Sequence, residues 1–171
     1  KLTLGTELTA TESALAGLPS DGSSANIKLG EIMTVEQLMY CMMVVSANEA
    51  CNILAEAAWG NVDAFVDQMN LRAQTLGCEN THFANTNGLH DPGHYTSAWD
   101  LYLITKEAMK HDVFVTISDT ANIKIPATNL SGERNYWTTN HLLSTWRVIG
   151  YLDKRAVGIK TGSTSEAGNC L

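Results

Sequence analysis

Apolar stripes at helical spacing, each bounded by a start or stop signal, most constrain the fold of this chain. Thr34 and Gln37 form a capping-box pattern ahead of apolar residues spaced three and four apart, which predicts a buried helix over about 34–45. Further stripes predict three more helices. Their boundaries are marked by Gly60, by Gly77, and by Thr96 or Ser97 with Asp100. A mainly helical subdomain is therefore expected over about 34–120.

Strand patterns are shorter and lie mostly toward the ends of the chain. Apolar and polar residues alternate over 1–8, over 122–125 and over 157–161, the last leading into Gly162. Neither a linker nor an internal repeat divides the sequence. We expect one partial α/β domain over 1–171, with sheet segments at about 1–8 and 155–171 in a small, incomplete sheet.

Charge and hydropathy exclude two classes of partner. The chain has 11 Lys and Arg against 18 Asp and Glu, a net charge of −7, and no basic run, so nucleic acid is not expected to bind. The longest apolar run, 38–45, is far shorter than the roughly 20 residues of a membrane-spanning helix. Membrane contact is expected only through segments outside this chain. The missing initiator Met and signal core, and the apolar-looking end at 167–171, predict a fragment.

The four cysteines do not form a recognisable framework. They include no CxxC pair and are too sparse for a disulfide scaffold. Cys41 and Cys51 lie among apolar residues at helical spacing, so buried free thiols are favoured over a bridge or a nucleophile. Cysteine usage leaves the redox compartment open.

The first motif with chemical interest is Ser46-Ala47-Asn48, between the first two predicted helices. One interpretation is a capping box, because Glu49 follows Ser46 by three residues. The functional interpretation needs Ser46 and Asn48 to point into one pocket. Residues two apart do so in an extended chain but not in a helix, so this interpretation predicts a loop.

The second motif is Lys160-Thr161-Gly162, at the end of a strand-like segment. A lysine ammonium beside a threonine hydroxyl suits a substrate carboxylate, and glycine lets a ligand approach the backbone closely. By itself the triplet is weak evidence, and an exposed lysine before a turn glycine is the favoured interpretation.

Taken together and in this order, the two motifs are two of the three shared by serine penicillin-binding proteins and class A β-lactamases, the third being Ser-x-x-Lys. The text around them resembles the serine D-alanyl-D-alanine carboxypeptidases, which are low-molecular-mass penicillin-binding proteins. The segments that carry the resemblance are 23–56, 65–101, 125–129 and 158–171.

This resemblance implies a β-lactamase/transpeptidase-like α/β fold. An antiparallel sheet would carry the Lys-Thr-Gly strand, a helical subdomain would hold the Ser-x-Asn loop, and the active site would lie between them. The implied catalytic residues are Ser46 as proton relay, Asn48 as a ligand of the substrate peptide and Lys160 as a source of positive potential. The implied substrate-binding residues are Thr161 for the terminal carboxylate, Gly162, and Ser163, whose backbone N–H would be an oxyanion-hole donor.

Two departures from the family pattern stand out. Ala47 occupies a position that is usually glycine in these carboxypeptidases. No serine has a lysine three residues on; the nearest cases pair Ser131 with Arg134 and Ser144 with Arg147, and arginine stays protonated and cannot act as a base. The nucleophile box is expected upstream of the region given, and this chain alone is expected to be inactive.

The resemblance implies a bacterial, extracytoplasmic serine carboxypeptidase that removes the terminal D-Ala from peptidoglycan stem peptides through an acyl-enzyme. Its partners would be those peptides and, as inhibitors, β-lactams; no cofactor is implied. Two alternatives remain: a non-catalytic relative that binds D-Ala-terminated peptides, and a β-lactamase.

Other conspicuous side chains have simpler interpretations. His90, Asp91 and His94 flank turn-forming residues and are expected to shape a loop, with no metal. Scattered histidines are expected at the surface or in hydrogen bonds, namely His82, His111 and His141. Four tryptophans are expected to anchor the core rather than to stack on sugars, namely Trp59, Trp99, Trp137 and Trp146.

Overall fold

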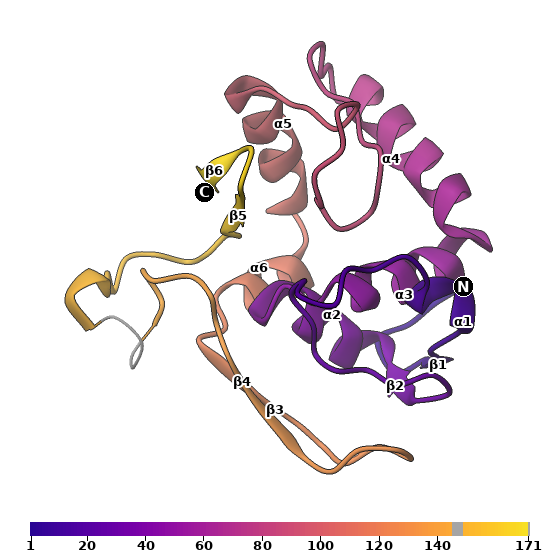
Figure 1. Cartoon of the computed structure of the whole chain (residues 1–171). Helices are drawn as coiled ribbons and strands as arrows, with labels where there is room; N and C mark the ends of the chain where they lie inside the picture. The colour runs from indigo at the N-terminus through magenta and orange to yellow at the C-terminus, as the bar shows by residue number, and fades with distance from the viewer. Residues whose placement is uncertain (145–148, 171) are drawn as a thin grey trace.

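The computed structural model describes residues 1–144 and 149–170, and it is a mixed arrangement of helices and short strands (Figure 1). The α-helices are α1 (Glu12–Leu15), α2 (Val35–Val44), α3 (Asn48–Trp59), α4 (Val62–Thr75), α5 (Ala98–Ala108) and α6 (Asp112–Ser118), with a 3-10 turn at Ile149–Tyr151. The strands are β1 (Glu7–Thr9), β2 (Ile32–Thr34), β3 (Asn122–Ile125), β4 (Arg134–Trp137), β5 (Gly162–Thr164) and β6 (Gly168–Cys170).

Local capping explains where the longer helices begin and end. The Thr34 hydroxyl accepts from the Gln37 backbone N–H at 3.2 Å, and the Gln37 side chain accepts from the Thr34 N–H at 2.9 Å, which confirms the capping box. The Ser97 hydroxyl caps α5 by accepting from the Asp100 backbone N–H at 3.1 Å. At the end of α3, Gly60 adopts a φ of 86°, a conformation that glycine reaches without a steric penalty. The four predicted helices are therefore confirmed.

The strands depart further from the sequence pattern. Within the described residues they form three separate two-stranded antiparallel sheets, β1–β2, β3–β4 and β5–β6, where one incomplete sheet was expected. The strand predicted at 157–161 is wrong, because extended pairing begins only at Gly162. The preceding segment packs on α6 instead: the Ser118 hydroxyl donates to the Val157 carbonyl, and it lies 3.0 Å from where a Cβ on Gly158 would be.

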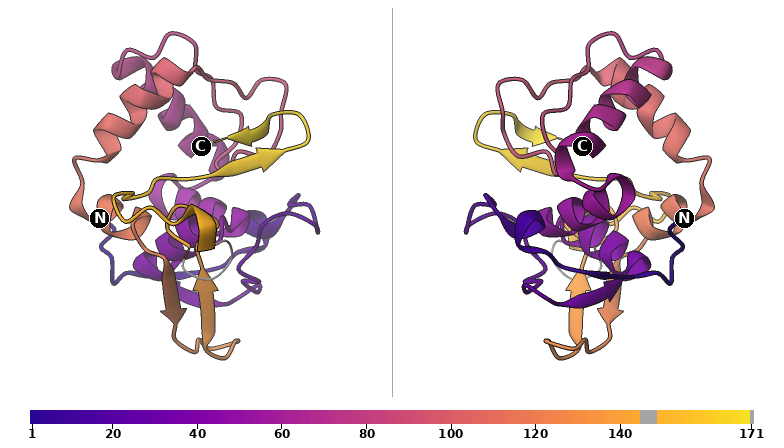
Figure 2. Two further views of the ribbon diagram at one scale, coloured as in Figure 1. Left: turned by 90° about the vertical axis from the view of Figure 1, so that its left-hand side faces the viewer. Right: turned by 90° about the vertical axis from the view of Figure 1, so that its right-hand side faces the viewer.

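The hydrophobic core joins the helices to the first two sheets. Met33 on β2, Leu38 and Cys41 on α2, Ile53 on α3 and Ile125 on β3 are all at most 3% exposed. In both views of Figure 2 the β3–β4 hairpin projects at one end of the molecule, and α4 and α5 lie at the other. The core therefore anchors the hairpin to the helical body through Ile125, at the loop end of β3.

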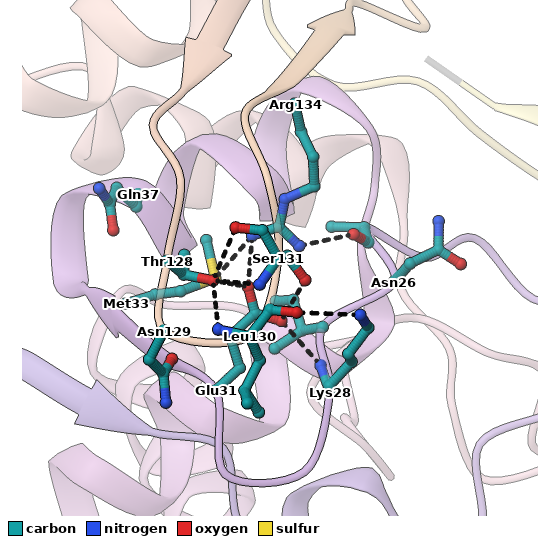
Figure 3. A network of polar contacts seen from close by, with 12 residues as sticks. Asn26, Lys28, Glu31, Met33, Gln37, Thr128, Asn129, Leu130, Ser131 and Arg134 are labelled. Atoms are coloured by element: carbon teal, nitrogen blue, oxygen red, sulfur yellow. Dashed lines mark hydrogen bonds and ion pairs between the residues drawn. The ribbon is translucent and has the colours of Figure 1, made fainter.

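A buried polar network fixes the tip of that hairpin to the loop before β2 (Figure 3). The Arg134 guanidinium donates to the Glu31 carboxylate at 2.6 Å, and the hydroxyl of Thr128 donates to the same oxygen at 2.7 Å. The second Glu31 oxygen accepts from the Lys28 backbone N–H at 2.9 Å. The Glu31 side chain is fully buried, so these donors replace the water it gives up on folding.

The tryptophans are not core anchors. Trp59, Trp99 and Trp137 are 52%, 66% and 42% exposed, so the expectation of core packing is wrong for these three, and Trp146 lies outside the described residues. Trp59 and Trp99 lie on helical positions that face solvent, where each contacts one aromatic ring, that of Phe65 and that of Tyr102.

Two further findings concern the cysteines and the helix lengths. All four cysteines are free; burial raises the pKa of the Cys41 and Cys51 thiols to about 12, which keeps both protonated and unreactive at neutral pH. Among the helices of the described residues, none combines the length and the apolar character needed to cross a bilayer.

Candidate active site

A cavity of about 670 Å³ lies where three distant parts of the chain meet. The first wall consists of Ser23, in the loop before β2, and Ser46, between α2 and α3. The other walls are residues 139–142, the segment 160–163, and the β6 residues Asn169 and Cys170. Ser46 and Lys160 therefore line the same pocket, although they are far apart in the sequence.

Ser46 lies in the tight connection between α2 and α3 and has a φ of 62°, in the left-handed region. The expected loop is present at this residue. The capping-box interpretation is wrong: Ala47 is the N-cap of α3 and makes no side-chain cap bond. Glu49 instead accepts from the Ser24 hydroxyl at 2.7 Å and from the Ala25 N–H at 2.8 Å.

Asn48 does not line the pocket. It is the first residue of α3 and only 6% exposed. Its backbone N–H donates to the Ser23 carbonyl, and its side-chain nitrogen lies 2.9 Å from where a Cβ on Gly22 would be. Because helical geometry begins at Asn48, its side chain does not follow that of Ser46. The structure brings Ser46 together with the 160–163 segment and leaves Asn48 against the turn at Gly22.

Lys160 is half-buried, and its ammonium donates to the neighbouring Thr161 carbonyl at 2.7 Å. Burial lowers the pKa of Lys160. No carboxylate pairs with Lys160 among the ion pairs of the described residues. The ammonium is therefore free to attract an anionic ligand.

Thr161 contacts the 139–142 wall of the pocket. Its hydroxyl lies 3.1 Å from that of Thr139, which ties the 160–163 segment to the 139–142 segment. Together with Ser46 and Ser163, the pocket presents several hydroxyls and one ammonium, and its described lining contains no carboxylate. This combination suits a ligand with a carboxylate end.

Sequence reasoning missed the 139–142 wall. Asn140 is only 3% exposed, and its side-chain oxygen accepts from the Leu142 N–H at 3.0 Å. His141 is exposed, as expected, and lies stacked on Tyr151. No local motif marks these residues, because their position depends on a contact with a segment about twenty residues further along the chain.

The loop containing His90, Asp91 and His94 lies outside the pocket lining. Asp91 accepts from the Gly93 N–H at 2.7 Å, and His94 accepts from the Ala84 N–H at 3.2 Å. These contacts shape the turn, in keeping with the loop expected from the sequence.

Comparisons with known proteins fit this geometry. The sequence profile of the D-alanyl-D-alanine carboxypeptidase family, peptidase family S11, matches residues 1–171. The chain belongs to this family. D-alanyl-D-alanine carboxypeptidase DacF of Bacillus subtilis is 33% identical over 150 residues, which are 88% of this chain and 36% of the relative. The chain thus spans about a third of the length of that carboxypeptidase.

Solved structures of related proteins support the same assignment. The Streptomyces K15 DD-transpeptidase superposes with a TM-score of 0.84 at 29% identity, covering 99% of this chain and 66% of that one. A D-alanyl-D-alanine carboxypeptidase from Mycobacterium tuberculosis gives a TM-score of 0.80 at 30% identity, covering 99% and 60%. The expected transpeptidase-like fold class is therefore confirmed for this family member, with its sheets small and not closed.

The backbone at Ser46 leads to a prediction about stability. We expect Ser46→Gly to be more stable than Ser46→Ala by about 1 kcal/mol, because alanine retains a left-handed φ that glycine adopts without strain. Urea unfolding of the two variants measures the difference. At Ser20, an exposed residue whose φ is not positive, the alanine variant should be the more stable. The same order at both positions would contradict the strain argument.

Proposed function

We propose that residues 1–171 form the substrate-binding side of a serine D-alanyl-D-alanine carboxypeptidase, which removes the terminal D-Ala of peptidoglycan stem peptides through an acyl-enzyme. The observation that carries this proposal is the shared pocket of Ser46, Lys160 and Thr161 in a member of the carboxypeptidase family. Acyl transfer from such a peptide needs a positioned hydroxyl, an oxyanion site and a clamp on the leaving carboxylate.

The pocket residues suit these roles. The Lys160 ammonium supplies positive potential, and the Thr161 hydroxyl, held by Thr139, donates to the terminal carboxylate of the substrate. The Ser163 backbone N–H is the proposed oxyanion donor, beside Gly162. Ser46 relays the proton. Asn48 contacts substrate in this proposal only after its side chain turns away from Gly22.

The β5 strand offers a further binding element. Within the described residues β5 pairs only with β6, so its other edge can accept an extended peptide as an additional strand. Main-chain hydrogen bonds along that edge would align the peptide with the 160–163 segment. Such pairing supports a peptide substrate rather than a small ligand.

The proposal extends to partners and location. β-Lactams would acylate the same site as inhibitors, and the site would act on the cell wall, outside the cytoplasmic membrane. The nucleophile would come from a Ser-x-x-Lys segment, because no serine of this chain has a lysine three residues on.

Penicillin labelling followed by intact-mass measurement tests the function. We expect a covalent penicilloyl adduct on a chain that carries a Ser-x-x-Lys segment in addition to residues 1–171, and none on residues 1–171 alone. An adduct on the shorter chain would identify a nucleophile within these residues. A longer chain that folds and binds D-Ala-D-Ala peptides without forming an adduct would instead support the non-catalytic relative, and rapid turnover of penicillin would support a β-lactamase.

A further inference from the structure

The 139–142 wall of the pocket contains an unpaired donor. The side-chain nitrogen of Asn140 is buried and has no hydrogen-bond partner among the residues that the structure describes, while its side-chain oxygen accepts from the Leu142 N–H. Leaving a buried amide donor unpaired destabilises the folded state. Asn140 lines the cavity, so a shift of its side chain toward the cavity would let this nitrogen donate to a ligand oxygen.

His141 presents a second donor beside it. Its ring stacks on that of Tyr151 with centroids 6.3 Å apart and an interplanar angle of 28°. Within the described part of the chain, the imidazole makes no side-chain hydrogen bond. His141 is exposed and lines the same cavity, so a ring N–H is available to a ligand.

The charge of the pocket indicates what this ligand group is. Lys160 and His141 are the ionisable nitrogen groups of the described lining, which contains no carboxylate, in a chain whose net charge is −7. Under the proposed function, Lys160 and Thr161 take the terminal carboxylate of the substrate. Asn140 and His141 then form a second donor pair that this first carboxylate does not use.

The cavity is large enough to hold a second polar group of the same substrate. At about 670 Å³ the cavity lies within the range that holds drug-sized ligands and is larger than two alanine residues need. The Thr139–Thr161 contact keeps the two donor pairs in one continuous cavity. A ligand whose terminal carboxylate lies at Lys160 and Thr161 therefore has room to extend toward Asn140 and His141 with the residue that precedes its two D-Ala residues.

We propose that Asn140 and His141 select stem peptides in which the residue before D-Ala-D-Ala carries a side-chain carboxylate. One carboxylate oxygen accepts from the Asn140 amide and the other from the His141 imidazole, a charge-assisted arrangement that a carboxamide reproduces only in part. This inference rests on the proposed carboxypeptidase function and adds a specificity determinant to it.

Two matched peptides test the inference on the longer chain that carries a Ser-x-x-Lys segment. Acetyl-Glu-D-Ala-D-Ala and acetyl-Gln-D-Ala-D-Ala differ only in the side chain before D-Ala-D-Ala, which ends in a carboxylate in the first peptide and in a carboxamide in the second. We expect kcat/KM to favour the glutamate peptide by about tenfold, the effect of one charge-assisted hydrogen bond. His141→Gln should bring the ratio close to one, whereas His111→Gln, at an exposed histidine outside the pocket, should leave it unchanged.

The outcomes separate the two proposals. Equal hydrolysis of both peptides by the unmodified chain, or an unchanged ratio in His141→Gln, overturns the inference alone. Failure to hydrolyse either peptide overturns the proposed function and this inference with it. Asn140→Asp, which places a negative charge at the wall, should invert the preference toward the glutamine peptide, and a retained preference for glutamate would also overturn the inference.

Discussion

Lys160→Ala is expected to lower the rate of penicillin acylation by about 100-fold or more in a chain that also carries a Ser-x-x-Lys segment. A charged donor in a partly dehydrated pocket stabilises a developing negative charge far more than it would in water, and loss of one such donor typically costs a factor of about 10²–10³. Lys160 is half-buried and unpaired by any carboxylate of the described ion pairs, so its charge is directed to the ligand. Stopped labelling at several penicillin concentrations gives the acylation rate.

A matched control for this variant is Lys154→Ala, which removes the same side chain from an exposed position outside the pocket. Its acylation rate should equal that of the unmodified chain. Unchanged labelling in Lys160→Ala would remove the carboxylate clamp from the proposed mechanism.

The pH profile provides a second check on Lys160. Burial lowers the pKa of Lys160 below its ordinary value of 10.5, so the ammonium is lost at a lower pH than in an exposed lysine. Acylation that depends on this charge should therefore decline on the alkaline side before pH 10.5. The alkaline decline should be absent from the residual activity of Lys160→Ala.

Arg134→Ala is expected to destabilise the fold by about 3–5 kcal/mol, the cost of leaving a buried carboxylate without its charged partner. The Glu31 side chain is fully buried and that of Arg134 is 15% exposed, and their atoms lie 2.6 Å apart. The same guanidinium also donates to the Ala25 carbonyl, so its loss removes two of the contacts between the β3–β4 hairpin and the segment before β2 (Figure 3). Urea unfolding followed by circular dichroism measures the change.

An exposed ion pair on the same hairpin serves as the control. Lys124 and Glu133 are 2.8 Å apart, but their side chains are 62% and 49% exposed. Lys124→Ala should cost less than about 1 kcal/mol, because solvent screens such pairs. Similar losses in Lys124→Ala and Arg134→Ala would contradict the burial argument.

The pH dependence of this pair has a defined sign. Burial raises the pKa of Glu31, but the Thr128 hydroxyl, the Lys28 N–H and the Arg134 charge together outweigh burial and hold that pKa below 4.5. A carboxyl whose folded-state pKa is lowered contributes stability above its unfolded pKa and loses it as pH falls through the folded value. The stability difference between the unmodified chain and Glu31→Gln should therefore shrink as pH falls below 4.5.

The sequence predicted those features that depend on neighbouring residues. The capping box at Thr34 and the helix end at Gly60 act over three or four positions, so a local pattern is sufficient to find them. The functional interpretation of the sequence needed Asn48 to lie in the loop, but Asn48 is the first residue of α3. Helix boundaries are the least certain part of a sequence pattern, and here one residue changes what a side chain faces.

Features that depend on distant contacts escaped the sequence. Val157 pairs with α6 rather than with another strand, which no alternation of apolar and polar residues reveals. Trp99 is exposed on α5, although its apolar surface favoured the core. Asn140 and His141 lie beside the 160–163 segment because of the Thr139–Thr161 contact. The two short motifs at Ser46 and Lys160 were recognisable because the family resemblance supplied the long-range information.

The cavity walls come from the helical body, the 139–142 segment and the C-terminal hairpin, three parts that lie far apart in the sequence. A ligand that contacts all three walls links these parts of the chain in the folded state. By mass action, saturation at a hundred times the dissociation constant adds about 2.7 kcal/mol to the folded state. A bound ligand would thus stabilise the association of the same parts of the protein chain that bind it.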